Sequence, residues 1–159
     1  MILVGQYDSP YVRRVAVSLH LLGVVFERAP LSTFRDIEAM RRLSPTLRIP
    51  ALVLDRGETL TDSNAILDWL DGEVGPGRAL VPPAGESRRR CWQAIGLAAT
   101  ACDKAKDILY ERALRPAEKV HEPVIERWRS QLEAALAGLE AMAGEPWLLG
   151  ERFSQADIT

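Results

Sequence analysis

Residues 48–66 read RIPALVLDRGETLTDSNAI, and this stretch decides the fold. Pro50 precedes the apolar run Ala51–Leu54, and because proline cannot donate to a strand ladder it belongs at a strand start or edge. Backbone groups beside it then stay free to pair with another chain segment or a ligand. Asp62 and Ser63 are common residues at a helix start, where free N–H groups favour an anion. Together these features predict a site that holds a peptide-like ligand by its backbone and its carboxylate.

Two further motifs lie near the ends of the chain. Close to the N-terminus, the strand-like Ile2–Val4 leads into Ser9-Pro10, and proline suits the first position of a helix. Close to the C-terminus, Ser154 and Asp157 have the spacing of a capping box, which starts a helix.

In this order, the three motifs resemble the glutathione S-transferase family, and the matches span nearly the whole chain. Members of that family have a thiol-activating residue before a proline, a cis-proline before the third strand, and an acid-Ser pair at the third helix. The resemblance is to a serine-type, bacterial-like member. It implies a thioredoxin-like domain followed by an all-α domain, with glutathione as co-substrate and no metal.

The spacing of apolar residues independently predicts the order β-α-β-α-β-β-α in the first half of the chain. The expected strands are Ile2–Val4, Val24–Arg28, Ala51–Leu54 and Glu58–Leu60. The expected helices contain Val12–Leu22, Phe34–Leu43 (ending before Ser44-Pro45) and Ile66–Val74. This order is the thioredoxin-like arrangement, in which a helix connects two parallel strands and a hairpin closes the sheet.

A segment rich in Gly and Pro, residues 75–85, is predicted to be an interdomain linker with few buried contacts. It separates a glutathione-binding domain, residues 1–74, from an all-α domain, residues 86–159, with two long helices. The start of the second long helix stays open, because Pro116 and Pro123 both interrupt the approach to it. The capping box at Ser154 implies a helix that continues past Thr159, so we expect part of the helical domain to be missing.

The composition is that of an ordinary globular protein, with 47% hydrophobic and 26% charged residues. A formal net charge of −2 gives no reason to expect nucleic-acid binding. No apolar stretch approaches the roughly 20 residues that span a bilayer, and no signal peptide is recognisable, so we expect a soluble cytoplasmic protein. Cys91 and Cys102 lie roughly 16 Å apart along one expected helix, which excludes a disulfide between them and predicts buried thiols. No Cys/His spacing suggests a metal site.

Ser9 is the catalytic candidate that the resemblance implies. A serine hydroxyl that donates a hydrogen bond, beside the positive end of a helix, can stabilise the reactive thiolate of glutathione. The alternative interpretation of Ser9 is a helix N-cap alone. Tyr7 is the alternative catalytic residue, because some branches of the family use a tyrosine at the end of the first strand. Otherwise Tyr7 is an aromatic contact.

The resemblance also implies residues that bind the tripeptide. Ile49 pairs its backbone with the cysteinyl part, and Pro50 holds the peptide bond cis. Asp62 and Ser63 bind the γ-glutamyl end, although Asp62 replaces the commoner Glu with a shorter side chain. The alternatives are a trans proline at a strand edge and a plain helix cap.

Arg35 and Arg48 are candidate partners for the glycyl carboxylate, with a solvated surface position as the alternative for each. The implied activity is attack of the glutathione thiolate on a small apolar electrophile, by a homodimeric detoxification enzyme. One alternative is a non-catalytic binding module, and another is a glutathione-dependent isomerase, dehalogenase or peroxidase. The Ser-Ser-Cys signature of the maleylacetoacetate isomerase branch is absent, because Asp8-Ser9-Pro10 stands in its place.

Overall fold

The computed structural model describes residues 1–44 and 46–159. Pro45, which the sequence places after the second helix, lies outside the described residues. Ile158 and Thr159 aside, the chain divides into two compact units, Met1–Pro83 and Ala84–Asp157.

A four-stranded mixed sheet forms the centre of the first unit, in the order β2-β1-β3-β4. Its strands are β1 (Ile2–Val4), β2 (Glu27–Ala29), β3 (Ala51–Val53) and β4 (Thr59–Thr61). The central strand β1 pairs with β2 in parallel and with β3 antiparallel, and β3 and β4 form an antiparallel hairpin. The predicted thioredoxin-like arrangement is therefore confirmed.

The parallel strand β2 begins later than predicted, at Glu27 instead of Val24. The reason is that the Val24 N–H donates to the Leu19 carbonyl at 2.9 Å, so this residue completes the turn after the first helix. The ladder beside Met1 starts only at Glu27, whose N–H donates to the Met1 carbonyl at 2.9 Å.

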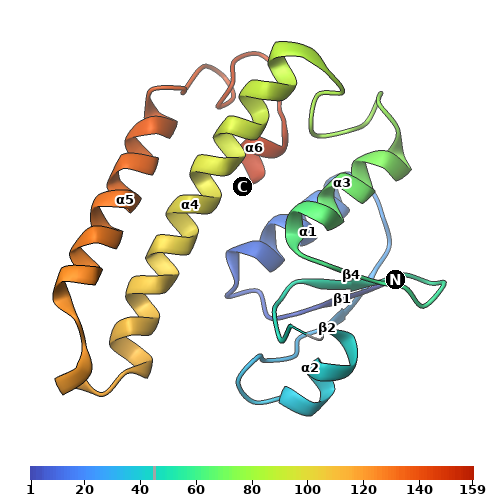
Figure 1. Cartoon of the computed structure of the whole chain (residues 1–159). Coiled ribbons are helices and arrows are strands. Elements are labelled where there is room, and N and C mark those ends of the chain that lie inside the picture. Colours follow the sequence, from blue (N-terminus) through green and yellow to red (C-terminus); the bar gives the residue numbers. More distant parts are fainter. Residues whose placement is uncertain (45) are drawn as a thin grey trace. The chain divides into compact units, whose positions relative to one another are not determined.

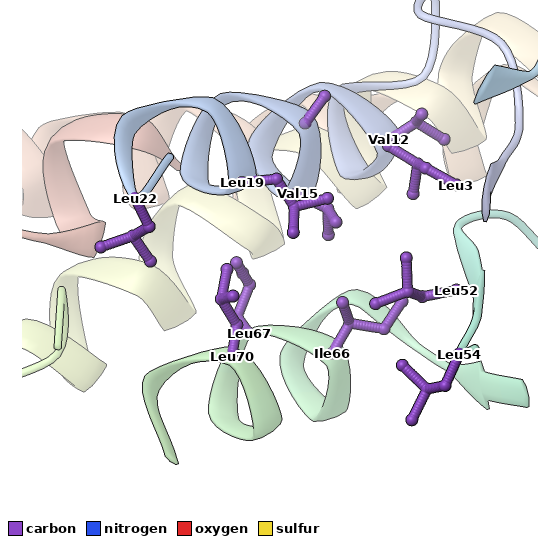
Figure 2. Close-up of a cluster of buried hydrophobic side chains, with 11 residues drawn as sticks. Leu3, Val12, Val15, Leu19, Leu22, Leu52, Leu54, Ile66, Leu67 and Leu70 are labelled. Atoms are coloured by element: carbon purple, nitrogen blue, oxygen red, sulfur yellow. The ribbon is translucent and has the colours of Figure 1, made fainter. Parts of the chain in front are cut away.

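Helices cover both faces of this sheet, with α1 (Pro10–Leu21) and α3 (Ser63–Val74) on one face and α2 (Ile37–Leu43) on the other (Figure 1). Successive strand residues alternate between the faces. Leu3 belongs to the core beneath α1 and α3, whereas Val4 packs with Met40 of α2. Figure 2 shows the larger core, in which apolar side chains of α1, its C-cap and α3 point toward one another: Val12, Val15, Leu19, Leu22, Ile66, Leu67 and Leu70.

The second helix starts at Ile37, three residues later than the predicted Phe34. Ser32 and Asp36 form a local turn ahead of it: the Phe34 N–H donates to Ser32 Oγ at 3.2 Å, and the Ser32 N–H donates to Asp36 Oδ2 at 2.7 Å. Such side-chain bonds to the backbone compete with helix formation, which explains the later start.

The Gly- and Pro-rich segment follows α3 and begins with Gly75, the C-cap of that helix, which has φ 76°. Leu80 and Val81 of this segment are held against α3, because the Asp71 carboxylate accepts from their N–H groups at 2.8 Å and 2.9 Å. Val81 is buried and Leu80 packs on the core. The expectation of few buried contacts is therefore wrong for these two residues.

The second unit is built on the helices α4 (Gly85–Leu114) and α5 (Glu122–Glu140), which run antiparallel (Figure 1). A short 3₁₀ turn, η1 (Ala117–Lys119), connects them. The second long helix, whose start the sequence left open, begins at Glu122. Pro123 lies in its first turn, where the missing N–H leaves no hydrogen bond unmade. The helices approach closely, since a Cβ on Gly138 would lie 3.1 Å from Leu97 Cδ1.

Both cysteines lie on α4, and they are not joined in a disulfide. Cys91 is buried as predicted, whereas Cys102 is only half-buried. Across the described residues, no helix is both long and apolar enough to cross a membrane.

The capping box predicted near the C-terminus is confirmed at the start of α6 (Gln155–Ile158). Ser154 Oγ accepts from the Ala156 N–H at 3.3 Å, and Asp157 Oδ2 accepts from the Ser154 N–H at 2.8 Å. The same carboxylate also accepts from the Leu148 N–H at 2.7 Å, which ties the preceding loop to the start of α6.

Candidate functional site

Ser9 occupies the N-cap of α1, directly before Pro10 in the first turn. Its Oγ accepts from the Val12 N–H at 3.4 Å, and its own N–H donates to the Gln6 carbonyl at 3.2 Å. A hydroxyl that accepts a hydrogen bond keeps its proton for donation. Ser9 can therefore cap the helix and donate to a ligand at the positive end of α1 at the same time.

Gly5 brings three elements together at the end of β1. Its backbone has φ 131°, and a Cβ there would lie 2.6 Å from Val12 Cγ2 and 2.9 Å from Ile49 Cβ. Real Cβ atoms do not approach other atoms this closely, so only glycine lets α1 and the loop at Ile49 pack against the strand.

The loop before β3 is closed by the buried side chain of Ser44. Its hydroxyl donates to the Arg48 carbonyl at 2.8 Å and accepts from the Arg48 N–H at 3.3 Å. Leu47, which lies between Ser44 and Arg48 in the sequence, has a positive φ of 52°. The peptide bond Ile49–Pro50 that follows is cis, as predicted. Among the described residues, no hydrogen-bond partner is found for the backbone N–H or carbonyl of Ile49.

Asp62 caps α3 in an unusual backbone conformation, with φ 75° and ψ 130°. Its carboxylate accepts from the Asn64 N–H at 2.8 Å. A non-glycine residue in such a region costs on the order of 1–3 kcal/mol, and strain of this kind clusters at functional sites. Ser63 follows as a buried residue at the first helical position, where backbone N–H groups favour an anion.

The loop before β3 and the start of α3 line one cavity of about 170 Å³. Its walls are Tyr11, Thr46, Arg48, Ile49, Pro50, Thr61, Asp62 and Ser63. The cavity wall thus combines free backbone groups at Ile49, an anion-favouring helix start at Ser63 and a cationic residue, Arg48. This chemistry suits an extended peptide with carboxylates at its ends. No group of three or more metal-ligating side chains is found in the part of the chain that the structure describes.

Comparison with known proteins identifies the family. The model described as the glutathione S-transferase N-terminal domain matches residues 3–78, and the model of the C-terminal domain matches residues 122–159. The chain belongs to the glutathione S-transferase family. The predicted family and fold class, a thioredoxin-like domain followed by a helical domain, are thereby confirmed.

Three relatives illustrate the family likeness. The maleylacetoacetate isomerase of Pseudomonas aeruginosa is 30% identical, over 99% of this chain and 77% of its own length. A glutathione S-transferase from Methylobacterium radiotolerans, in complex with glutathione sulfonate, superimposes with a TM-score of 0.91 at 28% identity, over 99% of this chain and 74% of that one. A glutathione transferase family member from Pseudomonas fluorescens Pf-5, with bound glutathione, is 38% identical and has a TM-score of 0.79. The match covers 88% of this chain and 70% of that one.

In this glutathione S-transferase family member, the cavity brings together five of the predicted site residues: Arg48, Ile49, Pro50, Asp62 and Ser63. Of the described residues, Ser9, Tyr7 and Arg35 are not among those that line it. Arg35 is exposed at the surface, and its N–H donates to Ser32 Oγ at 3.3 Å.

The Tyr7 hydroxyl is buried and has no hydrogen-bond partner among the described residues. The guanidinium carbon of Arg28 lies 3.5 Å from the centre of the Tyr7 ring, a cation–π contact. The hydroxyl of Tyr7 is thus closed off from solvent, whereas Ser9 is half-buried.

Sequence reasoning missed three residues of the cavity wall, Tyr11, Thr46 and Thr61. Their only sequence signal is position: Tyr11 follows Ser9-Pro10 by one residue, and Thr61 directly precedes Asp62. A tyrosine or threonine in a first helical turn or a strand end is common, so residue type alone does not mark them.

Proposed function

We propose that this chain is a glutathione transferase in which Ser9 activates the thiol of glutathione for attack on a small apolar electrophile. The observation that carries the proposal is the cavity in which Ile49, Ser63 and Arg48 lie together. Each offers a different part of the chemistry that a γ-glutamyl tripeptide needs. The two solved relatives named above contain glutathione or its sulfonate, which supports the same ligand.

The three parts of glutathione have separate partners in this proposal. The γ-glutamyl carboxylate binds Ser63 and the start of α3, and its amino group faces Asp62. The cysteinyl part pairs with the backbone of Ile49, next to Pro50. Arg48 binds the glycyl carboxylate, because it is the cationic side chain of the cavity wall. Arg35 is the second candidate for that role.

Ser9 then supplies the activation. Thiolate is the nucleophile, and an ordinary cysteine thiol has a pKa of about 8.5. Lowering the thiol pKa by about 1.5 units, roughly 2 kcal/mol, raises the thiolate from a few per cent to near half at pH 7. A hydroxyl donor at the start of α1 can supply an effect of this size. The buried hydroxyl of Tyr7 favours Ser9 over Tyr7 for this role.

A second candidate is a glutathione-dependent isomerase on the same scaffold. The observation in its favour is the likeness to the Pseudomonas aeruginosa maleylacetoacetate isomerase over nearly the whole chain. The residues Asp8-Ser9-Pro10, which stand where that branch has Ser-Ser-Cys, favour conjugation instead. On the basis of the family resemblance, we also propose that the protein is a homodimeric, cytoplasmic detoxification enzyme. Sedimentation equilibrium tests whether it is a dimer.

The experiment is to titrate the protein with glutathione in a calorimeter and to assay conjugation with a chlorodinitrobenzene electrophile. We expect saturable binding and turnover that depends on both substrates. Binding without turnover of this or a panel of electrophiles would support a non-catalytic module. Turnover of a cis-dienoate without conjugation would favour the isomerase, and an absence of glutathione binding would contradict every version of the proposal.

A further inference from the structure

Arg14 is a buried cation that the sequence patterns did not single out. It lies on α1 with only 3% of its surface exposed, although a charged side chain is costly to bury without strong partners. Its Nη2 donates to Asn64 Oδ1 at 2.8 Å. Asn64 belongs to the first turn of α3, directly after Ser63. A buried guanidinium on one helix therefore contacts the candidate anion site on another.

This contact determines how the Asn64 side chain is oriented. A guanidinium has only hydrogen-bond donors, so the amide oxygen of Asn64 must face Arg14 and the amide nitrogen is left as a donor. The backbone N–H of Asn64 in turn donates to Asp62 Oδ1 at 2.8 Å. Asn64 thus links Arg14, through its side chain, to the Asp62 cap, through its backbone.

Asp62 needs such support because of its backbone conformation, with φ 75°. A strained residue persists only when surrounding contacts hold it in place. The hydrogen bond from Arg14 anchors the turn from one side, and the Ile66 N–H, which donates to the Asp62 carbonyl at 3.1 Å, anchors it within α3.

We propose that Arg14 is a positioning residue, which acts through Asn64 to hold the first turn of α3 in the conformation that binds the γ-glutamyl carboxylate. This inference rests on the proposed function, because the carboxylate is that of glutathione. Arg14 itself does not contact the ligand. The effect of Arg14 is confined to the γ-glutamyl end of the tripeptide, and this selectivity separates a positioning role from a general structural one.

The test compares three inert ligands: the S-methyl derivatives of glutathione, γ-glutamylcysteine and cysteinylglycine. Their inhibition constants are measured for the wild type, Arg14→Met and Asn64→Ala. We expect both variants to bind the two γ-glutamyl ligands about tenfold more weakly, the effect of losing one hydrogen bond to a charged group. Cysteinylglycine, which lacks the γ-glutamyl end, should bind equally well to all three proteins. In turnover, KM for glutathione should rise while kcat stays the same.

Arg13→Met is the matched control, because Arg13 is the neighbouring arginine of α1 and is exposed. It should leave all three constants unchanged. Arg14→Lys keeps a charged donor and should recover much of the lost affinity. If Arg14→Met fails to fold, Asn64→Ala still decides the matter, since Asn64 is exposed.

Equal weakening of all three ligands, or no weakening of the γ-glutamyl ligands, would overturn the role of Arg14 and leave the proposed function intact. A wild-type protein that binds none of the three would overturn both.

Discussion

Ser9 caps α1 through a long hydrogen bond, in which its Oγ accepts from the Val12 N–H at 3.4 Å. This distance lies beyond the usual 2.7–3.2 Å, so the capping bond is weak. The hydroxyl proton is not used by that bond and can be donated to a thiolate. Tyr7 differs, because its hydroxyl is enclosed and its ring lies under the guanidinium of Arg28.

Ser9→Ala should remove the donor to the sulfur while the residues of the cavity still bind the tripeptide. Losing one charge-assisted hydrogen bond is worth about 1.5–3 kcal/mol, so turnover should fall roughly ten- to a hundred-fold. Calorimetric affinity for glutathione should change much less. The melting temperature is measured on the same variant, because loss of an N-cap costs about 1 kcal/mol. If Ser9→Ala kept full turnover while Tyr7→Phe lost turnover, the thiol-activating residue would be Tyr7 instead of Ser9.

Asp62→Gly should stabilise the fold and weaken the site. Glycine adopts φ 75° without strain, so the free energy of unfolding should rise by about 1 kcal/mol after the loss of the cap is subtracted. Glutathione affinity should fall about tenfold, because the carboxylate proposed to face the ligand's amino group is gone.

Asp62→Asn is the matched control for this change. It keeps a capping side chain of the same shape and the same backbone strain, so its stability should stay near that of the wild type, while affinity falls. Urea titration and calorimetry give the two quantities. A destabilised Asp62→Gly would contradict the strain at this residue.

At the scale of elements, the sequence predicted the strands and helices well wherever apolar periodicity was strong. The strands of the hairpin around Gly57 lie within one residue of their predicted bounds, and the helix starts at Ser63, within the predicted Asp62-Ser63 pair. The starts of β2 and α2 were misplaced, because local hydrogen bonds at Val24 and Ser32 take precedence over apolar runs. Such bonds depend on which groups meet in space, and periodicity does not carry that information.

Gly5→Ala should displace the elements that meet at the end of β1. Its positive φ costs about 1–3 kcal/mol for alanine, and the close approach of Val12 and Ile49 adds overpacking of about 1–3 kcal/mol. Gly57→Ala is the matched control, since it has φ 88° and no neighbour within 4 Å of a Cβ. Urea titration should show a larger loss for Gly5→Ala, and only this variant should lose glutathione affinity. Equal losses in both would show that the close packing at Gly5 is unimportant.

At the scale of the whole molecule, the family resemblance predicted more of the site residues than the residue patterns alone did. Residues 48–66 predicted free backbone groups and an anion site, and in the structure Ile49 and the start of α3 at Ser63 line one cavity. Tyr11, Thr46 and the Arg14–Asn64 hydrogen bond could not be predicted, because they depend on how α1, α3 and the loop before β3 meet in space. The segment at Leu80 and Val81 shows the same limit, since its composition predicted a linker with few buried contacts, whereas Asp71 holds it in place.

The pKa of the glutathione thiol, measured on the bound ligand, tests the proposed role of Ser9 with the fewest assumptions. Thiolate absorbance in the ultraviolet is followed across pH for glutathione bound to the wild type, Ser9→Ala and Tyr7→Phe. We expect the wild type to lower the thiol pKa by about 1.5 units, Ser9→Ala to lose most of that shift, and Tyr7→Phe to keep it. A bound thiol that titrates like free glutathione in the wild type, or a shift that survives in Ser9→Ala, would contradict activation by Ser9.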